Sequence, residues 1–154
     1  MSYILKNILN NPFEGLNYSK VTSDFGNRKF YNTVTKKYDT NYHNGIDLTS
    51  GTNIVAVSKG KVVEVVSNKE GYSEVFPRGN YVVLYHGEET FTCYYHMKLN
   101  SIVVNVGDIV EKGQFLGVKG NTGYSISEHL HFGVKVNDTW VDPKDYLLGI
   151  KSFP

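Results

Sequence analysis

The sequence contains one cysteine and no excess of either charge. The lone Cys93 cannot form a disulfide within the chain, and its aromatic neighbours predict a small buried side chain. Sixteen Lys and Arg nearly balance fifteen Asp and Glu, which gives a net charge of +1, and the basic residues are scattered. Because nucleic-acid binders carry a basic patch or stripe, we expect no nucleic-acid partner.

Long apolar runs are also missing. No window approaches the roughly 18–20 apolar residues of a membrane span, and residues 1–15 hold no apolar stretch of about 7–15 residues before a cleavage site. We therefore expect no membrane partner and no signal peptide in this chain. Because repeats, linkers and low-complexity segments are missing too, residues 1–154 are predicted to form a single domain, with a core at about residues 20–148 and a monomeric state by default.

Glycine and aromatic residues are abundant instead. The 15 Gly, 12 Tyr and 8 Phe indicate tight turns and β-structure rather than a helical bundle. Helices are expected only at residues 3–10 and 143–148, the second capped by Asp142. Short β-branched and aromatic runs predict an all-β, mainly antiparallel sandwich or barrel, with strands at 54–57, 61–66, 81–85, 91–96, 102–104, 114–118 and 130–136.

Two histidines flank Leu130 in the last of these strands. Apolar residues in 130–136 alternate with His131, Gly133 and Lys135, so the strand buries its apolar set and turns His129 and His131 to the opposite face. At about 3.3 Å per residue, their Cα atoms lie about 6.6 Å apart. One imidazole can therefore bind a metal while the other contacts a water molecule bound to that metal. The spacing does not decide which histidine has which role.

His96 ends a similar run. Alternation in residues 91–96 separates an apolar set from a more polar one, made up of Thr92, Tyr94 and His96, so His96 is expected to point out of the core. His86 belongs to none of these motifs and is expected to be an ordinary structural histidine.

The segment His43-Asn44-Gly45-Ile46-Asp47 offers two further ligands. On a straight strand His43 and Asp47 would lie about 13 Å apart, too far to share an ion. Gly45, at the midpoint, permits a bend, so irregular strand geometry is predicted there.

A His/Asp/His set that leaves a fourth position to water is typical of catalytic zinc. Such an ion lowers the pKa of its water toward about 7 and polarises a carbonyl. Two further histidines can move the proton and stabilise the oxyanion. The residues therefore predict metal-assisted amide hydrolysis with one Zn²⁺ ion.

Six segments carry a family resemblance: TSDFGNR (22–28), HNGID (43–47), GNYVVLYH (79–86), YHM (95–97), VGDIVEKGQ (106–114) and GNTGYSISEHLHF (120–132). Together they resemble the lysostaphin and LytM-like zinc endopeptidases, which cleave peptide cross-links in bacterial peptidoglycan. The resemblance runs along most of the chain. It implies a two-layer antiparallel β-fold with an open catalytic groove, a peptidoglycan peptide as partner, and no separate wall-binding domain here.

The resemblance also implies a role for each site residue. It makes His43, Asp47 and His131 the zinc ligands, and His96 and His129 the catalytic histidines.

Residues 30–42 match no family pattern, and loops at this place often line the groove. Candidate groove residues are Tyr31, Tyr38, Tyr42 and Tyr124, with ordinary packing as the alternative. Arg28 and Asp24 are interpreted as residues that support the fold.

Three functions are compatible with this pattern. The first is a zinc-dependent peptidoglycan endopeptidase. The second is a non-catalytic wall-binding or scaffold module on the same fold, for example in a phage tail. The third, a D-Ala-D-Ala carboxypeptidase or dipeptidase, ranks lowest because those relatives have a different ligand spacing. Without a signal peptide or targeting module in this chain, we expect a phage lysin, a virion-associated domain or an excised domain that acts on the extracellular or periplasmic side. The peptide bond cleaved is left open.

Overall fold

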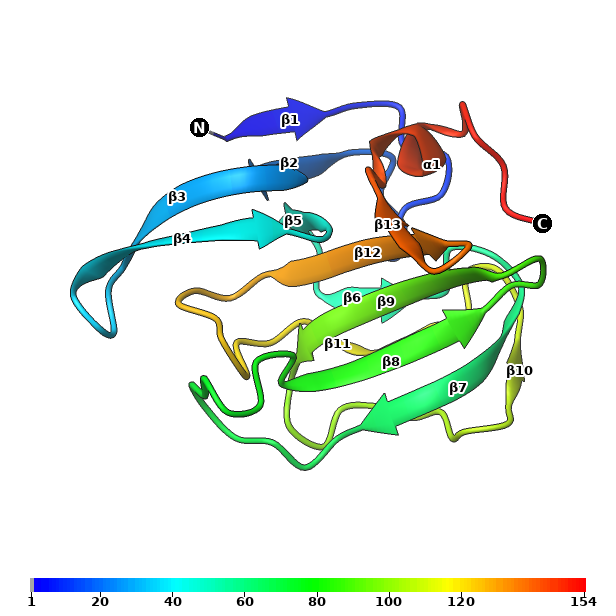
Figure 1. Cartoon of the computed structure of the whole chain (residues 1–154). Helices are drawn as coiled ribbons and strands as arrows, with labels where there is room; N and C mark the ends of the chain where they lie inside the picture. The colour runs from blue at the N-terminus through cyan, green and yellow to red at the C-terminus, as the bar shows by residue number, and fades with distance from the viewer. Residues whose placement is uncertain (1) are drawn as a thin grey trace.

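The computed structural model describes residues 2–154, in which one large sheet dominates. Its strand order is β1-β2-β5-β12-β9-β8-β7-β10, with β13 paired to β12 (Figure 1). The strands are β1 (Tyr3–Leu5), β2 (Ser19–Ser23), β5 (Ile46–Leu48), β7 (Gly60–Val66), β8 (Asn80–Tyr85), β9 (Thr90–Met97), β10 (Ile109–Val110), β12 (Leu130–Val136) and β13 (Thr139–Val141). All strand pairings are antiparallel, which confirms the predicted fold class.

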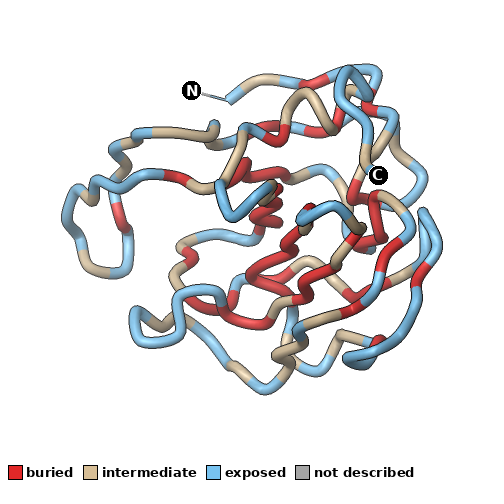
Figure 2. Tube along the Cα trace, turned by 45° about the vertical axis from the view of Figure 1, so that its right-hand side comes forward, coloured by how far each residue is buried: buried red, intermediate tan, exposed pale blue. Residues whose placement is uncertain are grey.

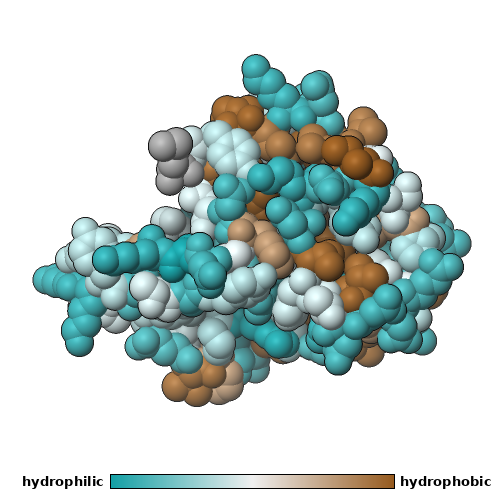
Figure 3. All heavy atoms as spheres, turned by 45° about the horizontal axis from the view of Figure 1, so that its top comes forward, coloured by the Kyte–Doolittle hydropathy of each residue, from teal (hydrophilic) through white to brown (hydrophobic). Residues whose placement is uncertain are grey.

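Two smaller sheets complete the fold. Strands β6 (Asn53–Val55) and β11 (Phe115–Val118) pair behind the large sheet, and β3 (Gly26–Asn32) and β4 (Lys37–His43) form a hairpin that projects from the body (Figure 1). Figure 3 shows a largely hydrophilic projection at this side of the molecule. The helix α1 (Lys144–Leu148) has five residues, and within residues 2–154 no helix is long and apolar enough to cross a membrane.

The main core lies between the large sheet and the β6–β11 pair. Ile54 of β6 and Leu116 of β11 are fully buried in the same cluster as Leu48, Tyr94 and Phe132 of the large sheet. Figure 2 shows this burial along the central strands and exposure along the hairpin and turns. The opposite face of the large sheet carries a smaller cluster built on Val83, Cys93 and Tyr95, and this face is the one that remains available for a functional site.

The alternation predicted for residues 130–136 is confirmed. Leu130, Phe132 and Val134 are fully buried in the main core, and His131 lies on the other face, opposite Tyr95 of β9. The face predicted for residues 91–95 is reversed. Thr92 and Tyr94 point into the main core, where the Tyr94 hydroxyl accepts hydrogen bonds from Val57 N and Thr92 Oγ1 at 3.2 and 2.9 Å. A buried tyrosine needs such partners, and neither one could be read from the strand pattern.

The predicted helix at residues 3–10 is wrong. Tyr3–Leu5 pair with Ser19–Ser23 instead, because a strand partner from a distant segment satisfies their backbone groups. The predicted strand at 102–104 does not form, although Val103 N–H donates to Leu116 O at 3.0 Å. The C-terminal helix is confirmed, and Lys144 N–H donates to Asp142 Oδ1 at 3.0 Å at its start.

Candidate metal centre and active-site cleft

Five candidate residues converge at one end of the large sheet. His43 ends β4, Asp47 lies in β5, His131 lies in β12 and His96 lies in β9, while His129 directly precedes β12. Strands β5, β12 and β9 are neighbours, and His131 is registered with Asp47 on one side and with Tyr95 on the other. Because directly paired residues of antiparallel strands point to the same face, the side chains of Asp47, His131 and Tyr95 share the face opposite the main core.

The predicted bend at Gly45 is confirmed, because β4 ends at His43 and β5 begins at Ile46. The glycine is required by close packing. A Cβ atom on Gly45 would lie 2.4 Å from Phe132 O and 2.7 Å from His131 Nε2. The absence of a side chain therefore lets the bend pass directly over the His131 ring and bring His43 back toward Asp47.

Three potential ligand atoms face one another in this bend. His43 Nε2 lies 3.0 Å from both His131 Nδ1 and Asp47 Oδ1, and His131 Nδ1 lies 3.4 Å from Asp47 Oδ1. Tetrahedral zinc with bonds of about 2.0–2.1 Å requires ligand atoms about 3.3 Å apart. Residues 43, 47 and 131 form a group that could hold a metal ion, and their spacing and donor types fit zinc.

The hydrogen bonds around these ligands leave their lone pairs unused. His43 Nδ1 lies 2.8 Å from the carbonyl oxygen of Asp24, which fixes the proton on Nδ1 and frees Nε2. Within residues 2–154, buried Asp47 Oδ1 has no hydrogen-bond partner. An acceptor oxygen and an acceptor nitrogen only 3.0 Å apart repel each other, and a cation between them removes this cost.

Electrostatics in the cluster keeps the ligands in their metal-binding forms. Burial raises the pKa of Asp47, but His129, His131 and His43 outweigh this effect and hold the pKa well below its usual range. Burial lowers the pKa of His131 to about 4. At neutral pH the cluster therefore contains a carboxylate and a neutral His131 ring, the protonation states that a metal requires.

His96 and His129 lie beside this group with their rings 4.9 Å apart. His96 Nδ1 lies 2.7 Å from Thr122 O, and His129 Nδ1 lies 2.7 Å from Ser127 O. Each carbonyl accepts the Nδ1 proton and leaves Nε2 free to accept another. Burial, followed by His129 and His131, lowers the pKa of His96 well below its ordinary value, so this ring is a neutral proton acceptor.

The orientation of His96 has a cause that the sequence pattern did not reveal. Strict alternation would place His96 on the same side as Tyr94, in the main core. His96 instead has φ of 66°, and the pairing of β8 with β9 is irregular between Asn80 and Val82. This left-handed residue turns the imidazole to the metal side, so the expected location is correct but alternation was the wrong reason.

A cleft of about 470 Å³ opens beside the five residues. Asp47, His96 and His129 line it, together with Tyr124 and Arg28. The Tyr124 hydroxyl donates to Asp39 Oδ2 of β4, and Asn32 Nδ2 donates to the same carboxylate at 3.0 Å. The hairpin is thereby tied to the segment before β12, and residues of both line the cleft.

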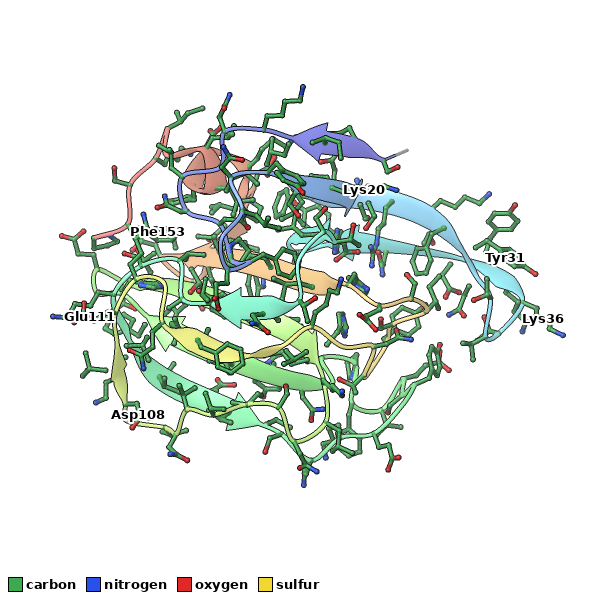
Figure 4. The ribbon with its side chains drawn as sticks, turned by 180° about the vertical axis from the view of Figure 1, so that it is seen from behind. Lys20, Tyr31, Lys36, Asp108, Glu111 and Phe153 are labelled. Carbon is green, nitrogen blue, oxygen red and sulfur yellow. The ribbon has the colours of Figure 1, made fainter. Side chains whose placement is uncertain are left out.

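The other candidate tyrosines lie elsewhere. Tyr38 and Tyr42 are 67% and 55% exposed and are not among the residues that line the cleft. Tyr31 pairs with Tyr38 on the same hairpin face, and Figure 4 shows Tyr31 pointing away from the body, near Lys36 at the hairpin end. The alternation of the hairpin separates these tyrosines from Phe30 and Asp39, which contact Tyr124.

Two residues assigned a structural role are buried away from the five candidates. His86 Nδ1 lies 2.8 Å from Lys59 O and its Nε2 lies 2.8 Å from Thr92 Oγ1, so both ring nitrogens are satisfied. Cys93 is buried and free, and burial raises the pKa of its thiol to about 12. An inert thiol agrees with the packing role that the sequence predicted.

Sequence reasoning underestimated Arg28. The sequence predicts a residue that supports the fold, yet its Nη1 donates to Asp47 Oδ2 at 3.0 Å and its side chain lines the cleft. Its one signal in the sequence is its place in the segment Phe25-Gly26-Asn27-Arg28. This segment is far in sequence from every candidate ligand, so the sequence alone does not connect Arg28 with the metal centre. Only the pairing of β2 with β5 and of β3 with β4 brings it there.

Comparison with known proteins gives a consistent set of matches. The model of peptidase family M23 matches residues 41–143. Peptidoglycan DD-endopeptidase ShyA of Vibrio cholerae is 34% identical over 113 residues, which cover 73% of this chain and 24% of ShyA. The first curated relatives that match are all longer, and the chain spans 20–33% of their lengths.

Solved structures agree with these matches. A zinc containing peptidase from Vibrio cholerae superposes with a TM-score of 0.68 at 28% identity and covers 97% of this chain and 41% of its own. The catalytic domain of lysostaphin from Staphylococcus simulans gives a TM-score of 0.64 at 31% identity, with 84% of this chain and 92% of that domain covered.

Proposed function

Because the chain belongs to peptidase family M23, we propose that it is a zinc-dependent endopeptidase that hydrolyses peptide cross-links of bacterial peptidoglycan. The observation that carries this proposal is the convergence of His43 Nε2, Asp47 Oδ1 and His131 Nδ1, buried beside an open cleft. A non-catalytic module would not need two additional histidines with free Nε2 atoms next to the ligand group.

The residues divide the work of amide hydrolysis. His43, Asp47 and His131 would hold zinc, which supplies an activated water and polarises the scissile carbonyl when bound. His129 Nε2 lies 3.5 Å from Asp47 Oδ1, at the ligand group, and is placed to accept a proton. His96 lies next to it and, once its Nε2 has accepted a proton, can stabilise developing negative charge or pass that proton to the leaving amine.

The proposed substrate follows from the relatives and from the shape of the cleft. ShyA is named a peptidoglycan DD-endopeptidase, and another relative, from Staphylococcus capitis, is named a glycyl-glycine endopeptidase. The cleft, bounded by Tyr124 and the β3–β4 hairpin, is open enough for an extended peptide. We therefore propose action at the cell wall, on the extracellular or periplasmic side, on one of these two classes of cross-link.

Purified sacculi with direct stem-peptide cross-links and sacculi with glycine bridges test this proposal. The zinc-loaded protein should release new amino groups from one of them, and mass spectrometry of the fragments identifies the bond. His43→Ala should remove both zinc and activity. His129→Ala should keep zinc but lose at least about 100-fold in kcat, the usual contribution of general acid-base catalysis. A zinc-loaded wild type that releases no amino groups from either substrate would contradict the proposal.

A further inference from the structure

Arg28 makes a set of contacts that converge on one carboxylate. Its Nη1 donates to Asp47 Oδ2 at 3.0 Å and to Ser23 Oγ at 2.9 Å. Its Nε donates to Asn41 Oδ1 at 2.8 Å, and its guanidinium carbon lies 4.8 Å above the Phe30 ring. Four neighbours therefore fix the plane of the guanidinium, and the side chain is only 22% exposed.

These contacts give the two carboxylate oxygens of Asp47 different partners. Oδ2 faces Arg28, while Oδ1 lies 3.0–3.5 Å from nitrogens of His43, His129 and His131. A carboxylate without the guanidinium could rotate about its Cβ–Cγ bond and present either oxygen to the histidines. The pair also neutralises the buried negative charge of Asp47 from the side away from the ligands.

We propose that Arg28 is a positioning residue for the metal centre, which holds Asp47 with Oδ1 directed at the metal position. The inference rests on the metal site of the proposed function, but it concerns ligand geometry rather than hydrolysis. Groups that orient metal ligands typically contribute about 10–100-fold to metal affinity. An arginine suits this role because its planar fork holds Asp47, Ser23 and Asn41 at once, which a lysine ammonium cannot do.

Zinc affinity, measured by chelator competition on folded protein, tests the role without relying on activity. Arg28→Gln should weaken zinc binding by about 10–100-fold, and Arg28→Lys should fall between it and the wild type. Asn41→Ala, which releases Nε but keeps the guanidinium, should weaken zinc binding less than Arg28→Gln does. The absorption spectrum of the cobalt-substituted variants should change as the ligand geometry loosens.

Lys29→Gln is the matched control. It removes the same charge from the next position of β3. Lys29 also lines the cleft, but its ammonium lies over the Tyr38 ring at 5.0 Å, on the hairpin face opposite to that of Arg28. The zinc affinity of Lys29→Gln should stay within about twofold of that of the wild type.

In an assay of peptide-bond hydrolysis, Arg28→Lys should lower kcat more than it raises KM.

The inference is overturned if folded Arg28→Gln and Arg28→Lys bind zinc as tightly as the wild type. If Arg28→Gln does not fold, unchanged affinity in both Arg28→Lys and Asn41→Ala has the same meaning. If Arg28 had only a structural role, its substitution would lower the thermal midpoint of the metal-free protein and leave zinc affinity unchanged. A wild type that binds zinc but cleaves no cross-link would refute the proposed function while leaving this affinity test intact.

Discussion

Backbone carbonyl groups set the protonation pattern of the histidine cluster. Asp24 O, Thr122 O and Ser127 O each lie 2.7–2.8 Å from the Nδ1 atom of a different histidine. These carbonyls belong to loops or strand ends rather than to the strands that carry the rings. Each carbonyl accepts the Nδ1 proton, so the Nε2 atom of each ring keeps its lone pair and is directed to the centre.

Gly45→Ala tests the close packing at the bend. The new methyl group would meet Phe132 O at 2.4 Å, and a backbone oxygen cannot move aside cheaply. We expect a loss of about 1–3 kcal/mol in the free energy of unfolding and a large loss of zinc affinity. Gly133→Ala is the control, because its Cβ would meet a side chain, the Trp140 ring at 3.0 Å, rather than a backbone oxygen. Equal zinc affinity in both variants would contradict the role of Gly45.

The depressed pKa of His131 predicts how the stability of the metal-free protein depends on pH. The pKa is about 4 in the folded protein, because burial disfavours the charged ring, and about 6.5 in the unfolded chain. Between these two pKa values the unfolded chain binds more protons than the folded protein. The contribution of His131 to the free energy of unfolding is therefore complete above about pH 6.5 and is lost as the pH falls toward 4. Urea unfolding with a chelator present should show a loss of up to about 3 kcal/mol over this range.

His131→Gln should remove part of this dependence. Unfolding free energies of the wild type that are the same at pH 7 and pH 5 would rule out a neutral buried His131 in the metal-free state.

At the scale of elements, the β3–β4 hairpin owes its position to side chains on its inner face. Phe30 packs edge-to-face on Tyr124 at 6.2 Å, and Asp39 accepts a hydrogen bond from the Tyr124 hydroxyl. This bond lowers the pKa of Asp39. A two-stranded ribbon is marginally stable alone, so these contacts are what keep it in place beside the cleft.

Tyr124→Phe removes no metal ligand but should loosen the hairpin. Hydrogen exchange should accelerate in residues 26–43 by about tenfold or less, consistent with the loss of one hydrogen bond. KM should rise more than kcat falls. Tyr31→Phe, on the outer face, is the control and should exchange like the wild type. Unchanged exchange in Tyr124→Phe would show that packing alone holds the hairpin.

At the scale of the molecule, the metal centre and the main core occupy opposite faces of one sheet. The core cluster includes fully buried residues from β2, β5, β6, β7, β8, β9, β11 and β12, and none of the candidate ligands belongs to it. Burial of this kind stabilises the fold independently of the ion.

Zinc should therefore stabilise a protein that is already folded. With chelator the protein should keep its β-sheet circular dichroism and a cooperative thermal transition. Free zinc at about 1,000 times its dissociation constant should add about 4 kcal/mol to the free energy of unfolding and raise the thermal midpoint. A metal-free protein without a cooperative transition would instead indicate that the ion is needed for folding.

The local sequence predicts much of this architecture, because the alternation of buried and exposed side chains along a strand is a local property. It correctly predicts the strand at 130–136, the face of His131 and the bend at Gly45, and the resemblance of the segments identifies the five residues that the fold brings together. It fails for residues 3–10 and for the four strands between residues 19 and 48, which are short or polar and depend on partners far away in the sequence.

The sequence by itself determined which side chains are available to bind a metal and that an all-β sheet carries them. Only the tertiary structure decided how they are oriented. The left-handed backbone at His96, the carbonyls that fix three imidazoles and the approach of Arg28 to Asp47 all depend on pairing between distant strands. Such pairing fixes hydrogen-bond partners and register at the same time, and neither is encoded in the periodicity of a single segment.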